Sequence, residues 1–103
     1  MSNGTDREEG TGTIIADKVR LPKRFAVLLY NDDYTTMEFV IEVLQTVFRK
    51  NKNEAMSVML QVHGEGKGKC GVYTYEIAEI KVAKVLQMSR GQGHPLKCTM
   101  EEE

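Results

Sequence analysis

The stretch FAVLLYNDDYTTMEFVIEVL, residues 25–44, contains a complete passage from strand to helix. Its first six residues are an apolar run of strand length, and the sequence Asn-Asp-Asp at 31–33 is a turn signal. Behind the turn, Thr35 and Glu38 have the spacing of a capping box, which predicts Thr35 as the N-cap of a helix. The apolar residues that follow recur at helical spacing. We therefore expect a strand followed directly by an amphipathic helix that extends to about Arg49.

The rest of the chain continues this alternation of elements. The spacing of its apolar residues predicts a second helix over 54–63 and a third over 75–90. Glycines make 64–69 a loop, after which 70–75 has the composition of a strand. A last, half-buried strand is expected at 96–100 because apolar and polar residues alternate there. The order β-α-α-β-α-β predicts an α+β domain, with a small three-stranded antiparallel sheet and three helices packed on one face.

Length and composition indicate one small domain with an N-terminal extension. The chain has 103 residues, which leaves no room for a second domain. Its first 20 residues hold three glycines, seven charged residues and no aromatic one, too few apolar groups to offset the entropy of ordering. We therefore expect a flexible arm over 1–21 and a folded domain over 22–103.

The charge and apolar patterning exclude several classes of partner. The formal net charge of −1 argues against general affinity for nucleic acid or acidic membranes. The longest apolar run falls far short of a membrane span, and no signal peptide is recognisable, so the expected location is the cytosol. Cys70 and Cys98 lack CxxC spacing. A disulfide between them is conceivable if their strands are neighbours, but two buried free thiols are the expectation for a cytosolic protein.

The polar residues at 31–36 are compatible in type with a metal site or a catalytic site. Together with the two cysteines, the candidate metal ligands are Asp32, Asp33, His63 and His94. They have neither the short paired spacings of a zinc site nor those of a calcium loop, so we expect no metal and no cofactor. Adjacent carboxylates in an extended segment point to opposite sides, and no activated Ser or Cys nucleophile accompanies them. We therefore expect that the protein is not an enzyme.

Binding of a cation is the third explanation of the same turn. An ammonium group has three donors and no acceptor, which suits an amide oxygen, a carboxylate and a neutral imidazole. Asn31 and Asp32 at the strand end and His63 on the second helix can supply these. Apolar residues of both helices could line a hole beside them, namely Met37, Val40, Met59 and Val62. The same spacing is also typical of plain core packing, so an α+β interaction or stalk module without a pocket remains the alternative.

Three longer motifs resemble the ClpS adaptor family. They are VLLYNDDYTTMEFVIEVL (27–44), MLQVHGEGKGKCGVYTYEIAEIKVAKV (59–85) and HPLKCTME (94–101), and the likeness covers about 22–102. ClpS-like proteins are not enzymes. They bind N-degrons, which are proteins whose first residue is Leu, Phe, Tyr or Trp, and pass them to the ClpA unfoldase of the ClpAP protease. The resemblance thus implies an adaptor.

The resemblance also implies a role for individual residues. Three would hold the free α-amino group, directly or through water: Asn31, Asp32 and His63. Seven would form or edge the pocket for the first side chain: Asp33, Thr35, Met37, Val40, Met59, Val62 and Leu96. Two on the exposed side of the third helix would contact the N-terminal domain of a ClpA-type AAA+ unfoldase: Glu76 and Lys81.

Further implications of the resemblance concern delivery and cellular context. In this family an unstructured N-terminal extension is needed for delivery, which gives the expected arm a role. Thr36 departs from the proline that many relatives carry at that position, and this predicts a somewhat looser entry into the first helix. The expected location is the bacterial cytoplasm, and the expected oligomeric state is a monomer. The expected partners are the N-terminal segments of substrate proteins and the unfoldase.

Overall fold

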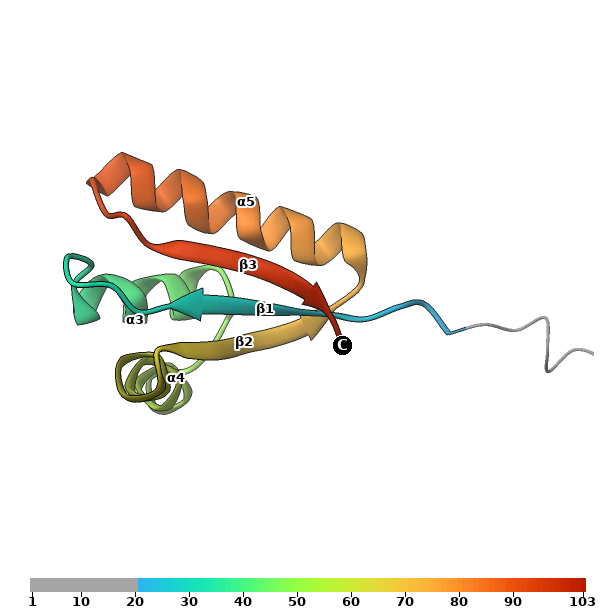
Figure 1. The fold of residues 1–103 in the computed structure, drawn as a ribbon, viewed down its shortest axis with the longest axis horizontal. Coiled ribbons are helices and arrows are strands. Elements are labelled where there is room, and N and C mark those ends of the chain that lie inside the picture. The colour runs from blue at the N-terminus through green and yellow to red at the C-terminus, as the bar shows by residue number, and fades with distance from the viewer. Residues whose placement is uncertain (1–20) are drawn as a thin grey trace, which may run out of the picture.

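The computed structural model describes residues 21–103 and shows a three-stranded sheet with three helices (Figure 1). In chain order, with the labels of Figure 1, the elements are β1 (Phe25–Tyr30), α3 (Met37–Thr46), α4 (Lys52–Glu65), β2 (Lys67–Tyr73), α5 (Tyr75–Gln92) and β3 (Lys97–Glu102). The predicted order β-α-α-β-α-β is confirmed. The expected N-terminal arm lies outside the described residues, apart from Leu21.

The sheet is antiparallel and has the order β2-β1-β3, with β1 in the centre. Val27 and Leu29 of β1 belong to the hydrophobic core and have no exposed surface. Side chains of a strand alternate between its two faces, so Leu28 and Tyr30 point to the opposite face. There the Tyr30 ring lies under the ammonium of Lys97, 4.7 Å from its centroid. One face of the sheet therefore packs on the core, whereas the other carries Tyr30 and Lys97 as well as the buried Leu28.

All three helices contribute apolar side chains to the core on the same side of the sheet. The buried residues are Phe39, Val40, Val43 and Leu44 of α3, Ala55, Met59 and Val62 of α4, and Ala78 and Val85 of α5. They form one cluster with Val27 and Leu29. The predicted packing of three helices on one face is confirmed. No helix within 21–103 is long and apolar enough to cross a membrane.

The two cysteines flank the central strand and both are free and buried. Cys98 on β3 lies opposite Leu29, whereas Cys70 on β2 falls at an irregularity in the pairing of β2 with β1. Because β1 lies between them, their strands are about 9–10 Å apart, farther than a disulfide can span. The condition for a disulfide, neighbouring strands, is therefore not met, and the expectation of free thiols holds. Burial raises the pKa of both thiols, that of Cys98 to about 12.

The capping residue of the first helix was predicted wrongly by one position. Thr36, not Thr35, is the N-cap of α3, and its hydroxyl accepts a hydrogen bond from the Phe39 N–H at 3.1 Å. The Thr35 hydroxyl instead donates to the Asp32 carboxylate. Thr36 thus precedes the first helical residue, where it supplies a side-chain acceptor that proline lacks. The prediction of a looser helix entry considered only the missing proline and not the hydrogen bond from the Phe39 N–H to Thr36.

The other boundaries also differ by a few residues. The helix α4 begins before the predicted Glu54, because Asn51 and Glu54 form a reciprocal capping box with N–H···O distances of 2.8 and 2.9 Å. It ends at Glu65, and its C-cap is Gly66, whose φ of 90° is a left-handed conformation that glycine adopts without strain. The segment 67–69, predicted as loop, is the first part of β2. Its lysines alternate with Gly68, which is buried although it has no apolar side chain to signal this.

Candidate N-terminus pocket

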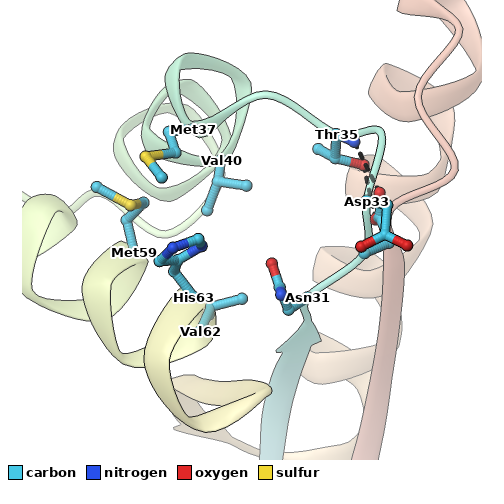
Figure 2. Close-up of a pocket in the computed structure, with 9 residues that line it drawn as sticks. Asn31, Asp33, Thr35, Met37, Val40, Met59, Val62 and His63 are labelled. Atoms are coloured by element: carbon cyan, nitrogen blue, oxygen red, sulfur yellow. Dashed lines mark hydrogen bonds between the residues drawn. The ribbon is translucent and has the colours of Figure 1, made fainter.

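A cavity of about 280 Å³ lies between the end of β1, the start of α3 and the last turns of α4 (Figure 2). Its lining consists of Asn31, Asp32, Asp33, Thr35, Met37, Val40, Met59, Val62 and His63. These are nine of the ten substrate-binding residues expected from the sequence. Leu96 does not line the cavity. Its side chain is 3% exposed and belongs to the core cluster, so a direct contact with a guest in the cavity is not supported.

The loop at 31–36, called the rim turn below, is organised around the Asp32 carboxylate. One carboxylate oxygen accepts from the N–H groups of Tyr34 and Thr35 at 2.8 and 2.7 Å, and the other accepts from the Thr35 hydroxyl at 2.7 Å. A carboxylate has about four acceptor positions, so one is left for a further donor. Asp32 therefore both shapes the rim turn and brings a negative charge to the cavity.

The environment of Asp32 favours its charged form. Partial burial raises the pKa of this carboxyl, but hydrogen bonds from the Thr35 N–H, the Thr35 hydroxyl and the Tyr34 N–H lower it, and so does the charge of His94. The net effect is a pKa below the ordinary value, because three donors favour the anion. The carboxylate consequently stays negative at neutral pH and well into the acid range.

Asn31 and His63 approach the cavity from different elements. The Asn31 N–H donates to the Gly66 carbonyl at 2.8 Å, which joins the end of β1 to the end of α4. His63 lies in the last turn of α4, so this bond fixes the two residues relative to each other. Figure 2 shows both side chains directed into the space between the strand and the helix. Together with Asp32 they bring an amide, a carboxylate and an imidazole to the lining of one cavity.

The apolar part of the lining is graded in exposure. Val40, Met59 and Val62 are 6%, 5% and 2% exposed and form its floor, whereas Met37 is 45% exposed at its mouth. The position of Val62 depends on Gly68 of β2, because a Cβ there would lie 2.8 Å from a Val62 methyl. Glycine thus allows α4 to approach the sheet closely. The result is an apolar hole with the flexible Met37 side chain at its mouth.

The two residues expected to contact an unfoldase differ in their surroundings. Glu76 is exposed in the first turn of α5. Lys81 is only partly exposed, and its ammonium donates to the Val47 carbonyl at 2.7 Å and lies 5.4 Å from the centroid of the Tyr73 ring. The expectation that Lys81 stands on the exposed side of the helix is therefore wrong in part. Its charge is engaged in fastening α5 to the end of α3.

The cavity has the composition of a receptor for an organic cation with an apolar side chain. Its volume is at the lower end of the range for small-molecule pockets, which suits a single amino-acid side chain better than a larger ligand. Within the described residues, no group of three or more His, Cys, Asp or Glu side chains could hold a metal ion.

His94, considered in the sequence only as a metal ligand, stacks instead on the Phe39 ring. No pattern in the sequence signals that contact.

Comparisons with known proteins show which family the chain resembles. The family model described as "ATP-dependent Clp protease adaptor protein ClpS" matches residues 20–99. The ATP-dependent Clp protease adapter protein ClpS of Nitratidesulfovibrio vulgaris (strain DSM 19637 / Miyazaki F) is 55% identical over 97 residues, which cover 94% of this chain and 97% of that protein. The protein of the same name from Maricaulis maris (strain MCS10) is 55% identical over 103 residues, covering 96% and 93%.

A solved structure is also similar. It is ClpS2 of Agrobacterium tumefaciens bound to L-phenylalaninamide, which is 38% identical and superposes with a TM-score of 0.78. The match covers 81% of this chain and all of the other. At this level of identity the likeness extends beyond the fold to much of the sequence.

Proposed function

The chain belongs to the ClpS family of ATP-dependent Clp protease adaptors, and we propose that it binds proteins through a free N-terminus whose first residue is bulky and hydrophobic. The relatives carry the name of an adaptor, which agrees with the expectation that the protein is not an enzyme. The observation that carries the proposal is the cavity itself, whose lining combines three polar groups with a buried apolar floor.

The three polar residues hold the α-amino group in this proposal. The ammonium donates to the Asn31 amide oxygen and to the neutral His63 imidazole. Asp32, which has about one acceptor position left, takes the third proton directly or through a water molecule and supplies the balancing charge. An acetylated N-terminus has lost the positive charge and two of the donors, so it is rejected.

The first side chain enters the apolar part of the cavity. Val40, Met59 and Val62 surround it, Asp33 and Thr35 stand at the edge, and Met37 closes the mouth. Leu, Phe, Tyr and Trp are the expected guests, because each has an unbranched Cβ that passes the mouth before the bulk of the side chain widens. L-Phenylalaninamide, the ligand of the similar ClpS2, has the required features: a free amino group, an aromatic side chain and an amide in place of the next peptide bond.

Delivery to an unfoldase is the second half of the proposal. We expect the partner to be the N-terminal domain of a ClpA-type AAA+ protein in the bacterial cytoplasm, reached by a monomeric adaptor. Glu76 on the exposed start of α5 is the stronger of the two contact residues, since the Lys81 ammonium is already engaged inside the domain. The arm over 1–21 would assist delivery to the unfoldase.

A pair of labelled peptides tests the pocket. One begins with a free Leu and the other is its N-acetylated twin, and binding is followed by fluorescence anisotropy. Binding of the free peptide and loss of binding with the twin is the expected result. Equal binding of both would mean that the cavity reads hydrophobicity alone, contrary to the roles of Asn31, Asp32 and His63. Failure of both would favour an interaction module that docks through its helices and uses no pocket.

A further inference from the structure

The rim turn is anchored at its two ends, but its outer part has few contacts. At one end the Asn31 N–H donates to the Gly66 carbonyl, and at the other Thr36 caps α3. Between them, the bonds of Asp32 are all made within the turn itself, and Tyr34 is 79% exposed. Local bonds hold the shape of a turn but do not hold it against the rest of the domain. Another contact must orient it.

His94 is placed to supply that contact from the other side of the fold. Its ring stacks on the Phe39 ring, with centroids 4.3 Å apart and planes inclined by 28°. Phe39 is 2% exposed in the first turn of α3, its own N–H is the one that Thr36 caps, and it immediately precedes the pocket residue Val40. The stack therefore fixes the segment in which the rim turn ends and the apolar wall begins.

The backbone around His94 is itself held firmly. Gly93 adopts a left-handed φ of 74° at the C-cap of α5, and the His94 N–H donates to the Ser89 carbonyl at 2.8 Å. Ser89 is 2% exposed, and its hydroxyl donates to the Val85 carbonyl. The imidazole is thus mounted on the end of the longest helix in the described part of the chain. It also lies near enough to Asp32 for its charge to act on that carboxylate.

We propose that His94 is a positioning residue of the pocket: stacked on Phe39 at the end of α5, it keeps the rim turn and the start of α3 in the geometry that receives a protein N-terminus. The inference rests on the proposed function, but it concerns a residue that does not touch the guest. Without the ring, the turn samples orientations in which Asp32 no longer converges with Asn31 and His63. Apparent affinity then falls in proportion to the fraction of molecules that remain competent.

Two substitutions of similar bulk separate stacking from burial. His94→Phe keeps a planar ring on Phe39, whereas His94→Leu covers Phe39 without one. An aromatic pair is worth enough to predict about threefold to tenfold weaker binding of the free-Leu peptide by His94→Leu. His94→Phe is expected to bind within about twofold of the native protein. The matched control is Val82→Ala on α5, which removes apolar atoms packed against the core at a residue outside the pocket lining.

A second measurement follows the turn without any peptide. Amide hydrogen exchange of Tyr34 and Thr35, whose N–H groups bond to Asp32, is expected to accelerate in His94→Leu and to stay unchanged in His94→Phe and Val82→Ala. Equal exchange and equal affinity in His94→Leu and the native protein would overturn the proposal, as would an equal loss in Val82→Ala. If the native protein binds no peptide, the proposed function fails, while the exchange experiment still decides whether His94 holds the turn.

Discussion

Asp32 has one role in the structure, shaping the rim turn, and one in the proposed function, supplying charge to the guest, and two substitutions distinguish them. In Asp32→Asn the retained carbonyl oxygen can still accept from the N–H groups of Tyr34 and Thr35, and the amide can donate to the Thr35 hydroxyl, so the rim turn survives while the charge and the free acceptor position are lost. In Asp32→Ala all three hydrogen bonds disappear with the charge. We therefore expect binding of a free N-terminus to weaken in the first variant and to weaken further in the second.

The magnitude follows from the charge and from the acceptor position that is left. An ammonium about 5 Å from the carboxylate, as expected with a water between them, interacts by about 3 kcal/mol at an effective dielectric constant of 20 and by about 1 kcal/mol in bulk water. The rim is partly exposed, so Asp32→Asn should weaken the free-Leu peptide by about 5-fold to 150-fold. Loss of the turn in Asp32→Ala adds the cost of one or more hydrogen bonds, about 1 kcal/mol each.

Fluorescence anisotropy with the free and acetylated peptides measures this effect against a built-in control. The residual binding of the acetylated twin, which has no ammonium, should be the same in the native protein and in Asp32→Asn. Native affinity of Asp32→Asn for the free peptide would refute the charge argument and leave Asp32 a purely structural residue. Native affinity of Asp32→Ala would refute both functions.

The lowered pKa of Asp32 also predicts how stability depends on pH. A carboxyl whose pKa is lower in the folded state stabilises the fold above its unfolded value, about 3.9, and this contribution is lost as the pH falls through the folded value. The native protein should therefore be more stable than Asp32→Asn at pH 7, with the difference vanishing in strong acid. Urea denaturation of both proteins at several pH values measures it. A difference independent of pH would contradict the assignment.

Three further substitutions test the apolar wall and the helix packing. Met37→Ala should admit peptides that begin with Ile or Val, measured by anisotropy, whereas unchanged discrimination would place the gate elsewhere. Gly68→Ala should cost about 1–3 kcal/mol of unfolding free energy, because its Cβ meets a Val62 methyl; Gly64→Ala, with no atom within 4 Å of its Cβ, is the control that should not destabilise. Lys81→Met should cost about 1–2 kcal/mol of unfolding free energy, measured by urea denaturation, since it breaks a charged hydrogen bond to the end of α3. An unchanged free energy of unfolding would mean that this bond does not hold α5 to α3.

The order of the elements could be predicted because the strongest signals in the sequence are local. The strand over 25–30 is predicted without error, because its apolar run is followed directly by a turn signal that marks its end. Capping was predicted less well, because Thr35 and Thr36 are adjacent and both have the right chemistry. A hydrogen bond within the turn decides between them: the Thr35 hydroxyl donates to Asp32, and Thr36 is left to cap the helix. The start of β2 was missed because Gly68 is buried by its neighbours and not by its own side chain.

The site could be predicted only with the help of the family resemblance. An amide, two carboxylates and a distant histidine are compatible with several chemistries, and their convergence depends on the bond between β1 and the end of α4 that no spacing in the sequence reveals. The place of Leu96 was also not evident from the sequence. An apolar residue in a matched motif can support the pocket from the core without lining it. His94 was missed because stacking between residues 55 positions apart leaves no periodic signal.

The two buried thiols on either side of β1 make it possible to measure how often the sheet opens. Only the thiolate reacts with disulfide reagents, and burial keeps both groups protonated and out of reach. Each thiol can react only when its outer strand separates from the centre or the helices lift away. The rates at which Cys70 and Cys98 are modified therefore measure the opening of the core around β2 and around β3, without a label that could disturb the pocket.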